Sequence, residues 1–348
     1  MNESPLLNFL QLDLAKLEKW QLAQFPMQEI KALEQLPLPS CVKIGEEAIH
    51  KGEVACLILS GGAGTRLGFK GPKGIFPLDQ EGTTLFKIHF KRIAKINPAL
   101  PVAIMCSPRN VQETREYLSA HDYFGMEPSA LSFFIQGTLP YLDEEGYLFL
   151  EDKGKVAEGP DGNGYALHKL VESGIYSIWK ERGVQTVHLI LIDNALSQPF
   201  DAGLIGAHLK AGNQVTLKTI PRIDPEEKVG VLVNLGDRIG VVEYSEMGQQ
   251  VREIAKFPYA NISLFAFDMK FIEAVADKPL PLHRAYKKMK GIEGEKMGWK
   301  LESFIFDLLI YSQKTGFIVE EREKTFAPLK EASGPFGPQA VLKRLRGA

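Results

Sequence analysis

Short apolar runs alternate with amphipathic stretches along most of the chain. The apolar runs predict buried strands at Val54–Leu59, Val102–Cys106, Leu131–Ile135, Val187–Ile192 and Val215–Ile220. Between them, apolar residues at helical spacing predict helices at Leu85–Ile96, Val111–His121, Tyr165–Arg182 and Leu204–Ala211. This alternation is typical of an α/β fold in which helices flank both faces of a mixed, mainly parallel sheet.

Other stretches fall outside the alternation. Residues 5–36 carry apolar side chains at helical spacing, and Pro26 divides them into two predicted helices of an N-terminal arm. Val229–Val233 and Ile239–Tyr244 flank a Gly-Asp turn and predict a hairpin laid over the sheet.

The C-terminal part of the chain has a different character. A basic stretch at His283–Lys290 precedes a predicted amphipathic helix at Leu301–Tyr311. For Lys287–Lys290 a solvated helix face is one interpretation, and phosphate contact by Lys287 or Lys288 is the other. The patterns together predict a helical arm at residues 1–48, a main α/β domain at 49–275 and a small C-terminal subdomain at 276–348.

Composition limits the partners of the chain. The 41 basic residues balance 43 acidic ones, so no overall basic field exists to hold nucleic acid. The sequence contains no apolar run of membrane-spanning length and no signal peptide, so we expect no membrane partner. Three cysteines without a CxxC pair indicate a reducing compartment, the cytoplasm. Cys56 and Cys106 lie inside apolar runs and are expected to be buried structural thiols.

The first predicted strand leads into a glycine loop. Residues 59–68 read Leu-Ser-Gly-Gly-Ala-Gly-Thr-Arg-Leu-Gly, and Gly-Pro-Lys-Gly follows at residues 71–74. Glycines allow backbone N–H groups to approach a polyphosphate closely. Arg66 and Lys73 add two cations that could reach the same triphosphate. We expect phosphate binding here, with a simple tight turn as the structural alternative.

Two other phosphate loops do not match. A dinucleotide-binding loop needs a third glycine where Leu67 stands, which argues against a dehydrogenase. A Walker A loop needs Gly-Lys-Ser/Thr, whereas Phe69 follows Gly68 here.

The loop instead resembles the Gly-Gly-x-Gly-Thr-Arg-Leu-Gly…Pro-Lys-Gly signature of sugar-nucleotide pyrophosphorylases. Roughly residues 50–335 resemble the UDP-sugar pyrophosphorylase superfamily, and most closely the eukaryotic-type UDP-N-acetylhexosamine pyrophosphorylases. Further matching blocks occur in order: His121–Gly125, Phe134–Gly137, Gly159–Gly164, Asp193-Asn194, Val229–Val231, Val242–Glu246 and Ala327–Lys330. The resemblance implies a Rossmann-like nucleotidyltransferase (GT-A-like) fold, with residues 49–275 as the catalytic domain.

The resemblance also implies the site residues. Asp193, at the end of a predicted strand, would hold Mg²⁺, which is usually bound by one or two carboxylates together with substrate phosphates and water. An Asp that caps the following turn is the alternative. Gln136 would read the edge of the uracil base. The other implied nucleotide-binding residues are Leu59, Ser60, Gly61, Gly62 and Gly162; the sugar-binding residues are Asn163, Gly230, Glu243 and Asn261; and the catalytic cations are Arg66, Lys73 and Lys330.

The implied reaction joins UTP to a sugar 1-phosphate. A phosphate oxygen of the sugar 1-phosphate attacks the α-phosphorus of UTP, and pyrophosphate leaves. The nucleophile is already an anion, so positioning and charge neutralisation matter more than a general base. N-acetylglucosamine 1-phosphate follows from the resemblance.

Several alternatives remain open at this point. Glucose 1-phosphate and galactose 1-phosphate are alternative substrates, because a few side chains decide between such sugars. A non-catalytic UDP-sugar sensor on the same fold is a more remote alternative. Tyr165 replaces a glycine expected from the resemblance, which leaves the contacts of that turn open. The oligomeric state is also open, with a monomer as one alternative.

Overall fold

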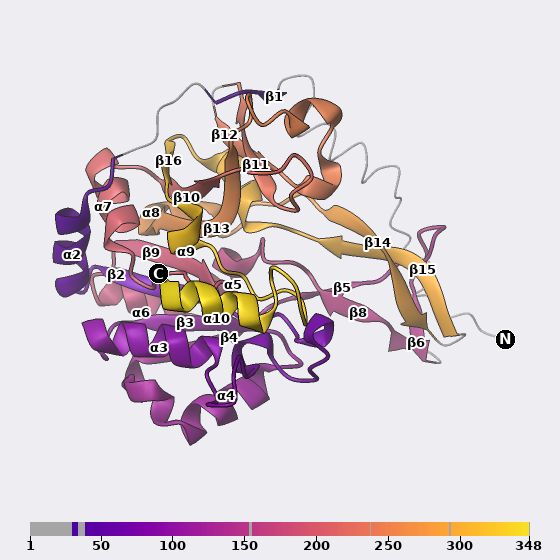
Figure 1. Ribbon diagram of the computed structural model, residues 1–348, viewed down its shortest axis with the longest axis horizontal. Helices are drawn as coiled ribbons and strands as arrows, with labels where there is room; N and C mark the ends of the chain where they lie inside the picture. The colour runs from indigo at the N-terminus through magenta and orange to yellow at the C-terminus, as the bar shows by residue number, and fades with distance from the viewer. Residues whose placement is uncertain (1–29, 34–38, 153–154, 237, 292–293, 348) are drawn as a thin grey trace.

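A computed structural model describes residues 30–33, 39–152, 155–236, 238–291 and 294–347. Ten strands form one central sheet, around which the helices are arranged (Figure 1). The strands of this sheet are β1 (Ile30–Lys31), β2 (Val54–Leu59), β3 (Val102–Cys106), β4 (Leu131–Ile135), β9 (Thr186–Leu191), β10 (Val215–Pro221), β11 (Gly230–Leu235), β12 (Ile239–Val242), β13 (Tyr259–Asp268) and β16 (Thr315–Val319).

Helices cover both faces of the sheet. The odd-numbered residues of β2 lie in a core with Trp179 and Phe271, whereas its even-numbered residues lie in a second core with Phe86 and Phe90. All six residues of β2 are buried, as expected for a central strand covered on both sides. The α-helices are α2 (Val42–His50), α3 (Leu85–Ile96), α4 (Val111–Ala120), α5 (Ala166–Glu172), α6 (Ile175–Glu181), α7 (Ala202–Ala211), α8 (Met269–Val275), α9 (Arg322–Thr325) and α10 (Pro338–Gly347).

The sheet combines two patterns of pairing. β9, β2, β3 and β4 are successive parallel neighbours, so their carboxyl ends share one edge. β13 runs antiparallel to β9, β10 and β11, and β16 is parallel to β10. The predicted mixed α/β sheet with flanking helices is therefore confirmed.

β13 changes its neighbour on one side part-way along its length. Its residues 265–268 pair with β9, whereas Ala260 and Asn261 pair with β11. Between these two pairings the ladder to β10 is irregular, and Ser263 has a φ of 56°, in the left-handed region that non-glycine residues seldom occupy. β9 and β11 therefore border the same side of β13 at different places.

Several predicted elements need correction. The predicted helix Tyr165–Arg182 is two helices, because Gly174 between α5 and α6 has a φ of 80°. The predicted hairpin is β11 and β12, but β11 pairs with β13 within the sheet and does not lie over it. The expected helix Leu301–Tyr311 is the end of a strand followed by the 3₁₀ helix η9 (Ile305–Tyr311).

The basic stretch forms a strand, so the helix interpretation was wrong. β14 (His283–Gly291) pairs antiparallel with β15 (Gly294–Glu302) over its whole length, and the two strands extend away from the central sheet (Figure 1). Successive lysines therefore point to opposite faces, and Lys288 pairs with Glu295 at 2.6 Å. Shorter strands accompany this arm: β5 (Thr138–Pro140) with β8 (Glu158–Pro160), and β6 (Leu150–Asp152) with β7 (Lys155–Val156).

Segments of both the predicted N-terminal arm and the predicted C-terminal subdomain pack on or pair with the central domain. β1 pairs with β11, so the helix predicted there is wrong for Ile30 and Lys31. Residues 5–29 and 34–36 of the predicted helical arm lie outside the described residues. α2 packs on α7, where Gly45 and Gly206 leave no space for a Cβ, and β16 joins the central sheet. The division at residues 48 and 275 stays a prediction.

No helix in the described part of the chain combines the length and the apolar character needed to cross a membrane. The thiols of Cys56 and Cys106 are buried and unpaired, as predicted. Burial raises the pKa of both thiols, that of Cys106 to about 12, so neither is a reactive thiolate at neutral pH.

Candidate functional site

The predicted metal ligand Asp193 and the predicted catalytic lysine Lys73 form an ion pair. Asp193 follows β9, and Lys73 opens the short 3₁₀ helix η4 (Lys73–Ile75) after the glycine loop. The Lys73 Nζ lies 3.0 Å from Asp193 Oδ2, and each side chain is less than one fifth exposed. The backbone N–H of Lys73 donates to the Gly62 carbonyl at 3.1 Å, which fixes the lysine to the loop.

Lys330 approaches the same carboxylate from the C-terminal part of the chain. The N–H of its neighbour Leu329 donates to the Asp193 carbonyl at 2.8 Å. Burial alone would raise the pKa of Asp193, but the cations Lys73 and Lys330 outweigh burial and hold it below the usual value. Asp193 is therefore ionised at neutral pH.

The donor set at Asp193 fits Mg²⁺ bound partly through a substrate. Within the described residues, no group of three or more His, Cys, Asp or Glu side chains is placed to hold an ion. A single ionised carboxylate suits Mg²⁺, which completes its octahedron with substrate phosphates and water. A site built only from protein ligands does not fit this part of the chain.

A cavity of about 250 Å³ opens beside this ion pair. It lies where β9 and β11 border β13 at different places, because Leu191, Gly230 and Ile262 all line it. Six predicted site residues share its wall: Asn163, Asp193, Gly230, Glu243, Asn261 and Lys330. The structure thus brings the predicted metal ligand, one predicted catalytic lysine and all four predicted sugar-binding residues together.

Glu243 is a second carboxylate in the lining of the cavity. Burial raises its pKa to about 7, even though the cations His283 and Lys330 act in the opposite direction. It therefore changes its charge near neutral pH, whereas Asp193 does not.

Aromatic residues form a wall of the cavity close to Glu243. Phe304 and Phe306 both line it, with their rings stacked at 5.0 Å between centroids. Behind them, His283 Nδ1 lies 2.7 Å from Glu246 and its Nε2 lies 3.0 Å from Asp307. Burial would lower the pKa of His283, but these carboxylates raise it to about 10. A charged histidine thus holds the wall in place.

The predicted base-reading residues also meet. The Gln136 amide donates to the Gly162 carbonyl, and its Oε1 lies where a Cβ on Gly61 would stand. Gly162, with a φ of 87°, could not carry a Cβ either, because the Ser303 carbonyl occupies that place. Three segments far apart in sequence therefore pack without spare room around Gln136.

The turn after Gly162 is fixed by backbone hydrogen bonds. The N–H groups of Asn163 and Gly164 both donate to the Ser303 carbonyl at 3.0 Å, and Asn163 Oδ1 accepts from the Ile305 N–H at 2.9 Å. Tyr165, where a glycine was expected, accepts from the Leu280 N–H through its hydroxyl at 3.2 Å. The tyrosine therefore holds the segment before β14 and leaves the glycine turn intact.

Residues 8–341 match the family model described as UTP–glucose-1-phosphate uridylyltransferase. The chain belongs to this family. UDP-N-acetylglucosamine diphosphorylase 1 from Arabidopsis thaliana is 35% identical over 319 residues, which are 84% of this chain and 63% of the relative. UDP-N-acetylglucosamine pyrophosphorylase from Saccharomyces cerevisiae is 31% identical, over 87% of this chain and 70% of the relative.

A solved structure with the same fold supports this family membership. The UDP-N-acetylglucosamine pyrophosphorylase of Trypanosoma brucei superposes with a TM-score of 0.80 and 30% identity, over 88% of this chain and 67% of that one. This likeness confirms the nucleotidyltransferase fold that the resemblance implied. The chain spans slightly less than two thirds of the length of the Arabidopsis relative.

Arg66 stands apart from the other predicted cations of this family site. It is exposed on the short 3₁₀ helix η3 (Thr65–Leu67) and acts electrostatically on Lys287 of β14. Partial burial lowers the pKa of Lys287, and the cations Lys300 and Arg66 lower it further against the opposing effect of Glu302. The arm therefore brings additional positive charge to the glycine loop.

Sequence reasoning missed two residues that lie next to the predicted site residues. Burial raises the pKa of the Asp161 carboxyl overall, and Lys300, on β15, lies close enough to lower it in part. Asp161 directly precedes the turn at Gly162. Asn110 donates to the Ser60 carbonyl at 2.9 Å and accepts from the Ser107 N–H at 2.7 Å, so it joins the loops after β2 and β3. The Ser60 hydroxyl itself is buried without a partner in the described structure.

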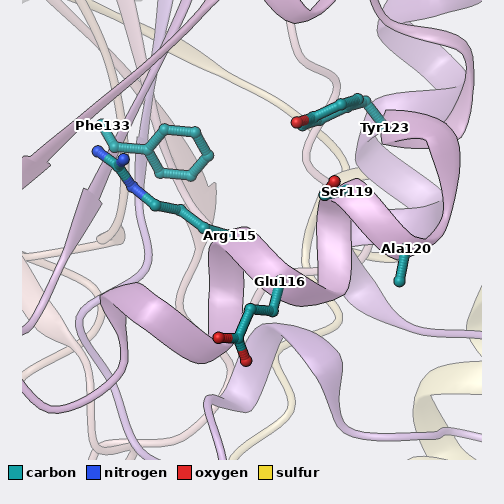
Figure 2. Close-up of a pocket in the computed structure, with 6 residues that line it drawn as sticks. All are labelled: Arg115, Glu116, Ser119, Ala120, Tyr123 and Phe133. Carbon is teal, nitrogen blue, oxygen red and sulfur yellow. The ribbon is translucent and has the colours of Figure 1, made fainter.

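A second, more open hollow of about 530 Å³ lies along α4. Figure 2 shows its lining, in which the Arg115 guanidinium lies 4.7 Å from the centre of the Phe133 ring. It shares no lining residue with the cavity at Asp193. None of the predicted site residues lines this second hollow.

Proposed function

We propose that the chain is a uridylyltransferase that converts UTP and N-acetylglucosamine 1-phosphate to UDP-N-acetylglucosamine and pyrophosphate. The observation that carries this proposal is the junction of two sites. Asp193, which pairs with Lys73 next to the glycine loop, lines the same cavity as Glu243 and three phenylalanines. A polyphosphate site beside a sugar-sized cavity suits a reaction between a nucleotide and a sugar phosphate.

The reaction is one displacement at phosphorus. A phosphate oxygen of the sugar 1-phosphate forms a bond to the α-phosphorus of UTP, and the bond from that phosphorus to the β-bridging oxygen breaks. Pyrophosphate leaves with the electron pair of the broken bond. No proton has to be removed from the nucleophile, which agrees with a site that offers cations and no paired base and nucleophile.

Each group of predicted site residues has its own proposed role. Gln136 and the Gly162 turn bind the base, while Glu243 and Asn261 accept or donate hydrogen bonds to sugar hydroxyls. Lys73 and Lys330 neutralise charge as it develops on the phosphates between them. Asp193 would hold Mg²⁺, which supplies further neutralisation of the phosphate oxygens.

The sugar assignment follows the named relatives, two of which are UDP-N-acetylglucosamine enzymes of more than 30% identity. Glucose 1-phosphate is the second candidate, because the matching family model is described by that substrate. The three unpaired cysteines support the cytoplasm as its compartment.

The decisive experiment measures pyrophosphate release with UTP, Mg²⁺ and a panel of sugar 1-phosphates. We expect the largest kcat/KM with N-acetylglucosamine 1-phosphate and little turnover when ATP or GTP replaces UTP. Comparable rates with ATP would contradict the uridylyl assignment. Binding of UDP-N-acetylglucosamine without any turnover would instead indicate a sensor.

A further inference from the structure

Asn194, next to the predicted metal ligand, is almost completely buried, with 2% of its surface exposed. Its Nδ2 donates to the Thr325 carbonyl at 2.8 Å. Its Oδ1 accepts from the Ala327 N–H at 2.8 Å and from the Leu196 N–H at 3.3 Å. Both polar atoms of the side chain are therefore used by backbone groups, two of them more than 130 residues away in sequence.

Two backbone hydrogen bonds continue the same contact. The Ala195 N–H donates to the Ala327 carbonyl at 3.1 Å, and the Leu329 N–H donates to the Asp193 carbonyl at 2.8 Å. The segment 325–329 thus runs antiparallel along residues 193–195, with Asn194 opposite Pro328. This contact, which we call the Asn194 latch, consists of residues 193–195 and 325–329.

Each of the two latch segments places one charged residue at the cavity. Asp193 begins one side, and Lys330 follows immediately after the other. Both side chains line the cavity, and Lys330 acts on the pKa of Asp193. The N–H of Lys330 also donates to the Phe336 carbonyl at 2.9 Å, so its backbone is held on both sides.

The structure assigns Asn194 a positioning role: it holds Lys330 at a fixed place relative to Asp193, so that both charges act on the same phosphates. This inference rests on the proposed function. Asn194 borders the cavity, but both its amide nitrogen and its amide oxygen bind backbone groups, so we infer that it acts through Lys330. An asparagine suits the place because it supplies a neutral donor and acceptor together.

The first test is a double-mutant cycle. In the parent protein we expect Asn194→Ala to lower kcat about tenfold, within the range of coupling between residues of one hydrogen-bond network. In a Lys330→Ala background the same change is expected to lower kcat less than twofold, because the positioned charge is already gone. Equal losses in both backgrounds would overturn the assignment.

A matched control separates positioning from general destabilisation. Asn213 is another buried asparagine, whose amide donates to the Thr216 hydroxyl at 3.0 Å, and it does not line the cavity. We expect Asn213→Ala to lower the melting temperature as Asn194→Ala does and to leave kcat and its dependence on Lys330 unchanged. A tenfold loss of kcat in Asn213→Ala would assign the effect of both variants to stability and overturn the inference.

The second test needs no turnover. Amide hydrogen exchange at Ala327 and Leu329 is expected to be at least tenfold faster in Asn194→Ala than in the parent protein, while exchange in β2 stays the same. Unchanged exchange at these two amides would overturn the latch. Failure of the parent protein to release pyrophosphate would contradict the proposed function but leave this measurement valid. If Asn194→Ala does not fold, Asn194→Asp removes the donor to Thr325 while keeping the acceptor, and the same outcomes apply.

Discussion

Two parts of the candidate site are built in different ways. At the part proposed to bind phosphates, which we call the phosphate end, Lys73 and Asp193 form an ion pair on loops that leave the carboxyl ends of parallel strands, and backbone hydrogen bonds fix both loops. At the part proposed to bind the sugar, which we call the sugar end, Glu243 directly follows β12, and the stacked rings of Phe304 and Phe306 come from the segment after β15.

Under the proposed function, this difference predicts that the phosphate end determines the rate of the reaction and the sugar end determines the choice of sugar. Charges held by backbone geometry cannot move far, so they are ready to stabilise a transition state without reorganisation. An aromatic wall around one carboxylate instead distinguishes ligands by shape and by hydroxyl pattern. Substitutions at the phosphate end should therefore lower turnover for every sugar, whereas substitutions at the sugar end should change which sugar is preferred.

The largest expected effect is that of Lys73→Ala. Loss of a donor that acts in the transition state typically lowers kcat by about 10²–10³, and we expect this loss with each sugar 1-phosphate while UDP-sugar binding changes little. Steady-state kinetics and equilibrium binding of UDP-N-acetylglucosamine measure the two quantities. Near-normal kcat with a raised KM for UTP would show that Lys73 contributes uniform binding only.

Asp193→Asn tests the metal at the same end. The neutral amide keeps the shape but loses the charge, and we expect the Mg²⁺ concentration for half-maximal rate to rise by about 10–100-fold, the range found when the surroundings of a metal ligand are altered. The ratio of rates with different sugars should stay the same. An unchanged Mg²⁺ dependence would remove Asp193 from the metal site.

At the sugar end, Phe304→Leu should change selectivity. The substitution removes part of the wall, and a loss of this size in an apolar pocket is worth about tenfold in discrimination. We expect the ratio of kcat/KM between N-acetylglucosamine 1-phosphate and glucose 1-phosphate to fall by that factor. Phe317→Leu, at a buried ring packed on Tyr259 at 5.0 Å, is the control and should leave the ratio unchanged.

The smallest effect concerns pH. Burial raises the pKa of Glu243 to about 7, so the carboxyl is mostly protonated at pH 6 and mostly ionised at pH 8. We expect the ionised form to accept a hydrogen bond from a sugar hydroxyl, so KM for the sugar 1-phosphate should fall as pH rises, by about fivefold for one hydrogen bond worth ~1 kcal/mol.

Glu243→Gln isolates this contribution. The phosphate of the substrate also titrates near pH 6, but it does so with both proteins, so the difference between their pH profiles belongs to Glu243. Parallel profiles of KM between pH 6 and pH 8 would contradict the role of the carboxyl at the sugar end.

The same contrast explains what sequence reasoning could achieve. β2 and β3 match their predicted ranges residue for residue, because strands buried on both faces are continuous apolar runs. β4 also matches its predicted range, although Phe134 is the one buried residue of this strand. β14 was missed because its sequence is mostly polar and resembles a solvated helix face. The strand pairs with β15 in an arm beside the central sheet, where its side chains need not be apolar. β13 was not predicted, because Asn261 and Ser263 interrupt its apolar run where the strand changes neighbours.

The site shows a similar limit. The glycine loop with Lys73 could be assigned from local chemistry, because the conformation and the charge lie in one short segment. Glu243, Asn261 and Lys330 depended on the family resemblance, since nothing near them in sequence indicates a ligand. The contacts of Asn110 and Asn194 could not be predicted, because their partners are backbone groups on distant segments.

The latch at Asn194 also determines when, during synthesis, the site can become complete. The ribosome makes the glycine loop early and Asp193 midway through the chain. Residues 325–330, which complete the latch and supply Lys330, are made more than 130 residues after Asp193. A nascent chain therefore carries a nucleotide loop without its second lysine for much of its translation. Any product that stops before residue 325 lacks Lys330 and two of the three hydrogen-bond partners of Asn194, so it leaves unpaired polar groups that the complete chain buries.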